Sequence, residues 1–305
     1  MSQAVRSVTR RAASARRRWT ATVGTVVVPA VIATLAVLYP GAPVAQVDLN
    51  DGAVWVTNAS RQLVGRYNAT VDDLNSAVAS PTSSFDVLQD RGDVVVTSPD
   101  AIAVVDPAAV ALSNPIEVPP DADVSLAGET VAVGDSATGE AWARTMAMVG
   151  TLSTATDPAD LELGPGGRVV VAPDGTVLGA AADGGLVRAR VTDDGVSVED
   201  DGALAGALTG DLDQVTAVGD ALVALVGTTV HTPSGEVDLA AYGDGLTLQQ
   251  PGAAAPVVLV ATRTSLLEVS MGGTTVRERL TGGTGNPAAP VRVGSCVHGA
   301  WASAV

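Results

Sequence analysis

The chain contains no lysine, and all 17 of its basic residues are arginines. Aromatic residues are also scarce: four tryptophans, three tyrosines and one phenylalanine make up 3% of the 305 residues. Within residues 46–305 the tryptophans and tyrosines are widely separated, at Trp55, Tyr67, Trp142, Tyr242 and Trp301. A carbohydrate-binding face needs several exposed rings close together, so we expect these rings to pack in cores instead.

The residues that build common catalytic and metal sites are few. The chain has two histidines, His231 and His298, and one cysteine, Cys296. No H-E-x-x-H, C-x-x-C, G-x-S-x-G or Walker motif occurs. Cys296 and His298 would share one face of a strand, but no signature of a cysteine hydrolase accompanies them. The sequence therefore predicts no catalytic residue, no metal site and no cofactor.

The lone cysteine leaves three interpretations open. In an exported protein, an unpaired Cys296 is either a free thiol or half of a disulfide. Because exported proteins meet an oxidising environment, its partner would lie beyond Val305 or on another chain. The third interpretation is a small buried apolar side chain.

Neighbouring carboxylates are frequent, but their spacing indicates no reaction centre. They occur at Asp72 and Asp73, at Asp193 and Asp194, and over residues 199–201. Two carboxylates about 5–9 Å apart could act on a glycosidic bond, yet nothing in the sequence brings a pair to that distance. The stretch TDDGVSVEDDG lacks the ligand order of a calcium loop. We expect these acids to lie on solvated hairpin tips.

An uncharged stretch divides the chain. Residues 19–39, from Trp19 to Tyr39, carry no charged side chain and would span roughly 31 Å as a helix, about the thickness of a bilayer core. The preceding 18 residues hold six arginines and no acid, which predicts a cytoplasmic N-terminus. We interpret residues 1–18 as a cytoplasmic tail, 19–39 as a transmembrane signal-anchor helix and 40–45 as a linker. A cleaved signal peptide is the alternative.

The remainder, residues 46–305, is then an extracellular domain on the outer side of the cell membrane. Beyond residue 18 the chain carries 33 acids and only 11 arginines. Such a surface repels nucleic acid, so no nucleic-acid partner is expected. A high net negative charge also suits a protein that must remain soluble outside the cell.

Short apolar runs alternate with turns containing Gly, Asp or Pro throughout this domain, which is typical of strands. A unit of strand, turn and stronger strand recurs six times, with its second strands centred on Trp55, Val95, Ala132, Val170, Ala224 and Leu259. These centres lie 35 to 54 residues apart, close to the period of propeller blades. The tripeptide Arg91-Gly92-Asp93 falls at the turn of one unit, so we assign it no adhesion role.

The repeat predicts an all-β, β-propeller-like domain of about six to seven blades. A seventh unit begins with a strand at residues 291–293 and a second strand at residues 300–302, after which the sequence stops. We therefore expect the last blade to be incomplete. The alternative is that residues 47–56 and the C-terminal strands share one blade and close the ring.

One unit contains VGDSATGEAW, which resembles the tryptophan-docking motif of quinoprotein-like propellers. Asp135, Thr138 and Gly139 match the motif, and Trp142 arrives one residue early. The resemblance implies that Thr138 and Gly139 form a hairpin turn, that Asp135 binds its backbone amides and that Trp142 packs between blades. It does not extend to residues that bind a quinone.

The layout as a whole resembles a family of actinobacterial single-pass membrane proteins. The shared features are an Arg-rich N-terminus, one span, a YPG-x-P linker, the unit DLNDGAVWVTN and the segment GSCVHGAWA. In that family an extracellular propeller precedes fibronectin type III or other Ig-like domains, which are absent from this sequence. The resemblance implies a surface scaffold of the cell envelope.

We therefore predict a non-enzymatic, membrane-anchored scaffold whose propeller loops bind a protein or an envelope component. The alternative is an exported enzyme, a glycoside hydrolase or a quinoprotein-like enzyme, with a site in the central channel. Convergent acids on the propeller axis would favour the enzyme. A sensor that signals through the helix is a third possibility, and it would need a partner in the membrane.

Overall fold

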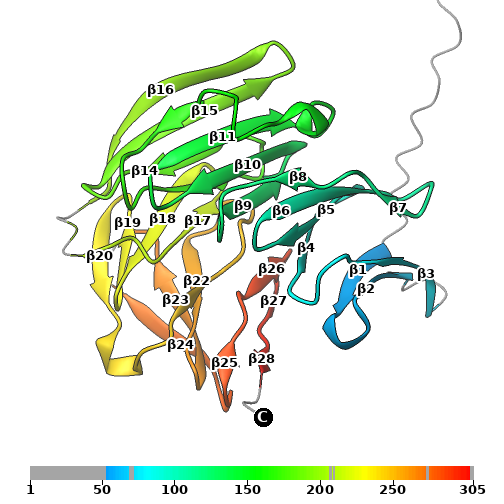
Figure 1. The fold of residues 1–305 in the computed structure, drawn as a ribbon. Helices are drawn as coiled ribbons and strands as arrows, with labels where there is room; N and C mark the ends of the chain where they lie inside the picture. Colours follow the sequence, from blue (N-terminus) through cyan, green and yellow to red (C-terminus); the bar gives the residue numbers. More distant parts are fainter. Residues whose placement is uncertain (1–52, 69–71, 206–207, 209, 273–274, 303–305) are drawn as a thin grey trace, which may run out of the picture. The chain divides into compact units, whose positions relative to one another are not determined.

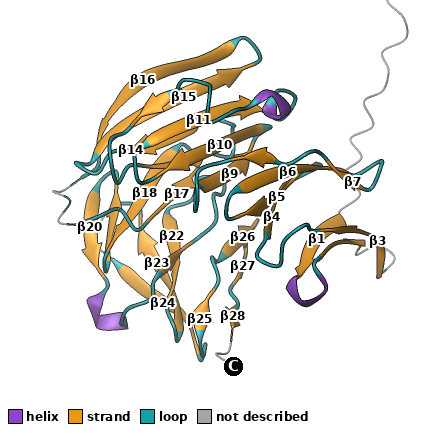
Figure 2. Cartoon of the chain, in the orientation of Figure 1, coloured by secondary structure: helices purple, strands orange, loops and turns teal. Residues whose placement is uncertain are grey.

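The computed structural model describes residues 53–68, 72–205, 208, 210–272 and 275–302 (Figure 1). Strands dominate this part of the chain, and its helices are single 3₁₀ turns (Figure 2). These turns are η1 (Ala59–Arg61), η2 (Val149–Thr151) and η3 (Ala240–Tyr242).

The predicted membrane segment is not among the described residues. The tail at 1–18, the helix at 19–39 and the linker at 40–45 all lie outside them. Within the ranges that are described, no helix has both the length and the apolar character needed to cross a bilayer.

The strands form consecutive antiparallel sheets, each made from one continuous stretch of chain. The first sheet contains β1 (Ala53–Asn58), β2 (Leu63–Asn68) and β3 (Asp73–Ala79). The second contains β4 (Asp86–Asp90), β5 (Asp93–Ser98), β6 (Ala101–Asp106), β7 (Ala111–Leu112) and β8 (Ile116–Glu117), with β7 and β8 both paired to β6. The third contains β9 (Asp123–Ala127), β10 (Thr130–Asp135), β11 (Glu140–Thr145) and β12 (Leu161–Glu162).

Three further four-stranded sheets and two short strand pairs follow in order. The fourth sheet contains β13 (Arg168–Val171), β14 (Val177–Ala180), β15 (Gly185–Thr192) and β16 (Gly195–Ala203). The fifth contains β17 (Gln214–Val218), β18 (Ala221–Val226), β19 (Thr229–Thr232) and β20 (Gly235–Asp238). The sixth contains β21 (Thr247–Leu248), β22 (Val257–Ala261), β23 (Ser265–Ser270) and β24 (Val276–Thr281). The last strands are two pairs, β25 (Asn286–Pro287) with β28 (Trp301–Ala302) and β26 (Val291–Val293) with β27 (Cys296–His298).

The second strands of the second to sixth sheets are buried on both faces, which explains their largely apolar sequences. In β5, Val94 and Val96 pack with Trp55 of the first sheet. Val95, on the opposite face of the same strand, packs with Val131 of the third sheet. The second sheet is thus a layer between two neighbouring sheets, as a blade is in a propeller.

Six clusters of buried apolar side chains connect the sheets, one at each successive interface from the first sheet to the last strands. No cluster among the described residues connects the last strands to the first sheet. Instead, apolar side chains are exposed at both ends of the series: Val54 (50% exposed), Val56 (44%) and Leu74 (53%) on the first sheet, and Val293 (62%) on β26. We call these surfaces the two end faces.

Among the described strands β1 pairs only with β2, so a blade shared with the C-terminal strands is not seen.

Two-residue turns between the first and second strands recur as the sequence predicted. Arg91-Gly92 joins β4 to β5, Gly128-Glu129 joins β9 to β10, and Gly219-Asp220 joins β17 to β18. Arg91 has φ +54° and Glu129 has φ +64°, the left-handed conformation that such tight turns require. The interpretation of Arg91-Gly92-Asp93 as an ordinary turn is confirmed.

One predicted unit is wrong. The sequence placed Val170 in the second strand of a unit that began at Asp160. In the structure β12 is the outer strand of the third sheet and β13, which contains Val170, is the first strand of the fourth. The intervening residues do not form a hairpin, because Leu163 N donates to Gly139 O and Gly166 N donates to Ser136 O, both over 2.8 Å. These bonds carry the chain from the outer edge of one sheet to the next sheet.

The end of the chain also differs from the prediction. The first strand expected there is confirmed as β26, but its partner is β27 and not residues 300–302. Gly294, with φ +58°, lies in a tight turn that returns the chain at once. Trp301 of β28 instead donates its indole N–H to Thr262 O, 2.7 Å away, which holds β28 against the sixth sheet.

Candidate functional site

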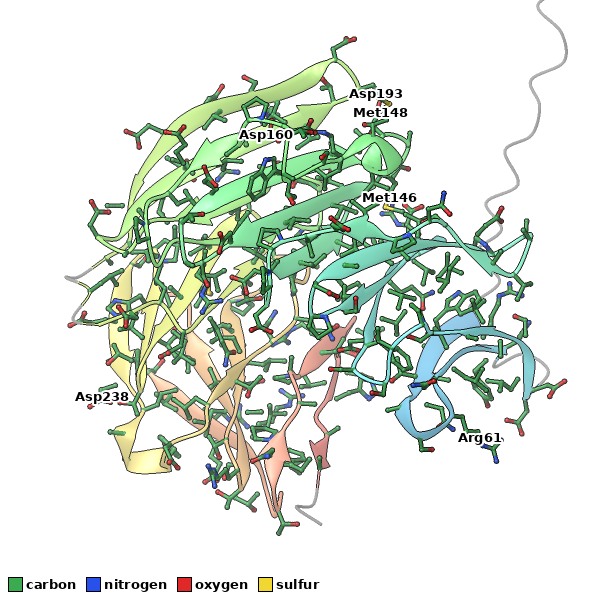
Figure 3. All side chains as sticks on the ribbon, viewed as in Figure 1. Arg61, Met146, Met148, Asp160, Asp193 and Asp238 are labelled. Atoms are coloured by element: carbon green, nitrogen blue, oxygen red, sulfur yellow. The ribbon has the colours of Figure 1, made fainter. Side chains whose placement is uncertain are left out.

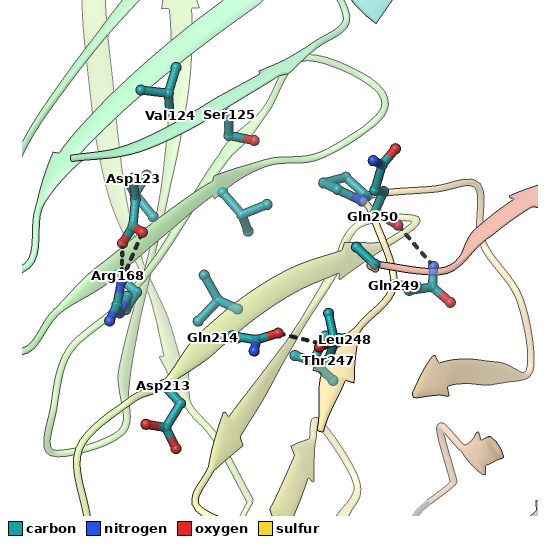
Figure 4. Close-up of a pocket in the computed structure, with 15 residues that line it drawn as sticks. Asp123, Val124, Ser125, Arg168, Asp213, Gln214, Thr247, Leu248, Gln249 and Gln250 are labelled. Carbon is teal, nitrogen blue, oxygen red and sulfur yellow. Dashed lines mark hydrogen bonds and ion pairs between the residues drawn. The ribbon is translucent and has the colours of Figure 1, made fainter. Parts of the chain in front are cut away.

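The first strands of four consecutive sheets, β9, β13, β17 and β21, line a cavity of about 250 Å³ that we call the axial cavity (Figure 4). Its polar lining residues come from all four strands and the residues beside them, and they include Asp123, Ser125, Arg168, Asp213, Gln214 and Gln249. Sequence analysis found none of these residues, because they belong to different repeats and form no local motif.

An ion pair crosses the cavity from β9 to β13. Arg168 Nη1 lies 2.8 and 2.7 Å from the two carboxylate oxygens of Asp123. Arg168 Nε also donates to the backbone oxygen of Leu212 over 3.0 Å, so this one side chain connects three successive sheets. The side chains of Arg168 and Asp123 are 24% and 31% exposed. The charge of Asp123 is therefore compensated within the protein.

Amide and hydroxyl side chains on these strands bind the backbone of neighbouring strands. Gln214 Oε1 accepts from Leu248 N over 2.9 Å. Ser125 Oγ accepts from Val171 N over 2.9 Å, and the same relationship occurs between Gln89 of β4 and Trp55 N over 3.0 Å. These bonds satisfy backbone amides on edge strands of three of the sheets, which would otherwise lack a partner.

The second acid of the axial cavity also binds a protein group. Asp213 Oδ2 accepts from the backbone N–H of Gly227 over 2.6 Å. Asp123 and Asp213 thus each hold a structural group, one a guanidinium and the other a turn. This arrangement differs from the pair of carboxylates that acts directly on the substrate in most glycoside hydrolases.

A second cavity of about 360 Å³ lies at the ends of β4 and β9, where the connection from β21 to β22 approaches them. Within this connection Gly252 N donates to Ala217 O over 3.0 Å and Gly252 O accepts from Gly219 N over 2.8 Å. The loop is therefore fixed to the end of β17, and its residues 250–252 line the cavity.

Acids gather beside this second cavity. Asp90 Oδ2 accepts from Gly128 N over 2.7 Å. The pKa of Asp93 is raised above its usual range, chiefly because burial disfavours the charged form and also because Glu129 and Asp90 repel it, while Arg91 acts in the opposite direction. Within the described residues, no group of three or more His, Cys, Asp or Glu side chains has an arrangement that could hold a metal ion.

A surface groove of about 440 Å³ runs between the second and third sheets. One wall is formed by residues 113–117, around β8, and the other by residues of the connection between β11 and β12, including Gly150, Leu152 and Ala155. Thr154 Oγ1 donates to Glu117 O over 3.3 Å and joins the two walls. Figure 3 labels Met146 and Met148, which begin this connection.

The residues of the tryptophan-docking motif lie together at the hairpin between β10 and β11. Asp135 Oδ1 accepts from Ala137 N over 2.9 Å, and Asp135 Oδ2 accepts from Thr138 Oγ1 over 3.0 Å. Gly139 has φ +76°, and a Cβ there would lie 1.8 Å from Gly164 O. The hairpin turn is thus packed directly against the segment that leads into the fourth sheet.

Trp142 is 3% exposed and belongs to the cluster between the second and third sheets. Its indole N–H donates to Asp157 O over 3.1 Å. Two strand positions away, Arg144 binds Asp157 over 3.1 Å and Asp160 over 2.7 Å. Together these residues fix the connection that forms one wall of the groove.

The histidines and the cysteine do not form a common site. Cys296 is a free, exposed thiol on β27, and His298 on the same strand is exposed as well. His231 is 2% exposed on β19, where its Nδ1 lies 3.2 Å from Ala205 O and 3.7 Å from Glu236. Asp193 and Asp194 form the exposed turn between β15 and β16, as predicted, whereas the acids at residues 199–201 are exposed within strand β16 and not at a hairpin tip.

Comparisons with known proteins identify the fold. No protein-family model and no curated protein sequence matches the chain. Its structure is similar to that of apo AztD from Citrobacter koseri, with a TM-score of 0.55, 10% sequence identity and coverage of 83% of this chain and 78% of that chain. KlAtg21, in complex with a coiled coil of AgAtg16, gives a TM-score of 0.54 at 13% identity and coverage of 76% and 81%. The dihydro-heme d1 dehydrogenase NirN gives 0.52 at 12% identity and coverage of 84% and 59%.

These neighbours are β-propeller proteins, so the chain has a β-propeller-type fold. At 10–13% identity the similarity concerns the fold alone. The neighbours include both enzymes and binding proteins.

Proposed function

We propose that this chain is a non-enzymatic binding scaffold: a propeller that binds a protein or an envelope component and is anchored to the membrane by residues 19–39. The observation that carries the proposal is that polar side chains in the axial cavity bind other groups of the protein. Asp123 compensates Arg168, Asp213 holds a turn, and Gln214 binds a neighbouring strand. These bonds commit the polar groups of the axial cavity to the framework, which leaves the loops and the sheet edges as the surface for recognition.

The structural neighbours support a binding role. KlAtg21 was solved in complex with a coiled coil, and the fold presents many loops on a rigid framework. The same fold also occurs in a dehydrogenase, NirN, which keeps the exported enzyme as the alternative. An enzyme would need a reactive group in the axial cavity that is not already committed to the framework.

The topology of the chain belongs to the same proposal. Residues 1–18 would be cytoplasmic and residues 46–305 extracellular, as a domain of about six to seven blades with an incomplete last blade. The two exposed end faces support this incompleteness, because a closed ring would bury Val54, Val56 and Val293. In the actinobacterial family that the sequence resembles, fibronectin type III or Ig-like domains follow the propeller, and such domains would adjoin one of these end faces.

The exposed thiol of Cys296 tests the proposed location. A membrane-impermeant maleimide should label intact cells expressing the full chain, and Cys296→Ser should abolish the label. Labelling only after lysis would contradict an extracellular domain. If labelling of intact cells requires prior reduction, Cys296 is half of a disulfide.

A substrate screen tests the non-enzymatic assignment. The purified full chain should hydrolyse no aryl glycoside and reduce no soluble quinone at a rate that changes in an Asp213→Asn variant. Asparagine keeps the oxygen that accepts from Gly227 N, so the variant removes the charge of residue 213 while preserving the turn. Turnover that is lost in this variant would overturn the proposal in favour of the enzyme.

A further inference from the structure

The groove between the second and third sheets has the features of a recognition site. Its volume of about 440 Å³ is far larger than the roughly 30 Å³ that one water occupies, so it admits side chains of a ligand. Its walls combine small or apolar side chains, Pro115, Ile116, Leu152 and Ala155, with the polar side chains of Asn114 and Ser153. Such a mixture suits a peptide, which presents both an apolar and a hydrogen-bonding surface.

The groove is preformed. Asp157 accepts from Ser153 N over 3.1 Å, and its backbone oxygen accepts from the indole of Trp142 over 3.1 Å. Arg144 binds the same aspartate, so the wall that contains Leu152 is held by several bonds to buried strands. A ligand would therefore meet a wall that is already ordered, which reduces the entropic cost of binding.

Charge around the groove selects the partner. Residues 86–162, which form the second and third sheets, contain 14 acids and only two arginines, Arg91 and Arg144. Arg144 is already paired with Asp157 and Asp160. Glu117, in the groove wall, is exposed, and no basic side chain among the described residues forms an ion pair with it. The resulting field attracts cations and repels acidic ligands.

We propose that this groove binds an extended peptide segment of a partner protein that carries arginine or lysine. The aliphatic part of a basic side chain would lie along Ile116 and Leu152 while its charge pairs with Glu117. The side chain of Asn114 offers a donor and an acceptor to the peptide backbone. This inference rests on the proposed binding role of the propeller and names the chemistry of its partner.

The test uses the purified full chain and two synthetic peptides, acetyl-GRVRVRG-amide and its acidic counterpart acetyl-GEVEVEG-amide. We expect the basic peptide to bind saturably, with an affinity that falls as salt is added, and the acidic peptide not to bind. Glu117→Arg should weaken binding of the basic peptide by about tenfold or more.

Gly150 allows the groove to be filled without disturbing the fold. A Cβ at Gly150 would meet no atom within 4 Å, and its φ lies outside the left-handed region, so Gly150→Phe should be tolerated. Gly92 has the same two properties and lies in the turn between β4 and β5, outside the groove lining, which makes Gly92→Phe the matched control. Thermal melts of both variants verify that they fold.

Loss of basic-peptide binding in Gly150→Phe, with retention in Gly92→Phe, is the expected result. Equal binding by both variants, or equal binding of the two peptides, would overturn the groove proposal. Failure of the basic peptide to bind at all would also overturn it, yet it would leave the proposed location and the non-enzymatic assignment intact, because labelling and the substrate screen test these separately.

Discussion

Asp123 of β9 and Arg168 of β13 are joined across a sheet-to-sheet interface, with one guanidinium nitrogen 2.8 and 2.7 Å from the two carboxylate oxygens. Because both side chains are only partly exposed, removing one partner leaves the other poorly solvated. Arg168→Met keeps most of the side-chain volume and removes the charge. It should lower the free energy of unfolding by about 1–2 kcal/mol, measured by urea denaturation. Asp123→Asn should cost less, and a cost near zero for both variants would show that solvent screens the pair completely.

Gly139 and Gly227 form a matched pair for a glycine test. Both have positive φ, +76° and +58°, but only at Gly139 would an added Cβ collide with backbone, at Gly164 O. Gly227→Ala should therefore cost about 1 kcal/mol of conformational strain. Gly139→Ala should cost about 3 kcal/mol or more, because the hairpin must also move away from the following segment. Similar melting temperatures for the two variants would contradict this packing.

The hydrogen bond between Trp142 and Asp157 can be removed while the ring is retained. Trp142→Phe deletes the indole N–H and leaves Asp157 O without this donor, so we expect a loss of about 1–2 kcal/mol. Amide exchange should accelerate most in the connection between β11 and β12. Trp301→Phe, which removes a bond to Thr262, is the control and should affect the sixth sheet instead.

Asp93 should make stability fall as pH rises. Its pKa in the folded protein is raised above 3.8, so the folded state binds this proton more tightly than the unfolded chain does. The free energy of unfolding therefore decreases as pH increases through the interval between the two pKa values, and the penalty is complete above the higher one. Asp93→Asn should raise the melting temperature at pH 7. The gain in the free energy of unfolding should be less than about 1 kcal/mol, because the site is partly hydrated. The gain should vanish below about pH 3.8.

The Asp93→Asn experiment needs a control variant at a nearby acid that does not interact with Glu129 and Asp90. Asp100, exposed in the turn between β5 and β6, serves this purpose. If Asp100→Asn changes the pH dependence as strongly as Asp93→Asn, the effect reflects the net charge of the sheet and not the neighbours of Asp93.

Local sequence patterns predicted the strands and their tight turns because each depends on nearby residues. The run around Val95 indicated a strongly apolar strand, and Gly128-Glu129 indicated a turn. The assignment of Val170 was wrong for a different reason. Residues 164–168, GPGGR, have the composition of a hairpin turn, but the backbone amides of Leu163 and Gly166 bind Gly139 and Ser136 in the turn between β10 and β11. Such tertiary contacts have no signal in the local sequence.

The candidate sites were largely invisible to sequence reasoning for the same reason. Asp123 and Arg168 are 45 positions apart, and Thr154 and Glu117 are 37 apart. Neither pair forms a motif. The docking motif did indicate where Asp135, Thr138 and Gly139 lie, but it gave no indication that Trp142 anchors the wall of a groove.

Within residues 53–302, as far as the structure describes them, the two end faces make the series of sheets resemble a one-dimensional array more than a closed circle. In a circle every sheet has two neighbours, whereas among the described residues the first sheet and the last strands each have a buried apolar cluster on one side only. Their packing energy is correspondingly smaller, so fraying should begin at these ends and spread inward. The third to fifth sheets, which Arg168 connects through Asp123 and Leu212, would open last. Any molecule that covered Val54 and Val56 would act as a cap and slow unfolding along the whole array.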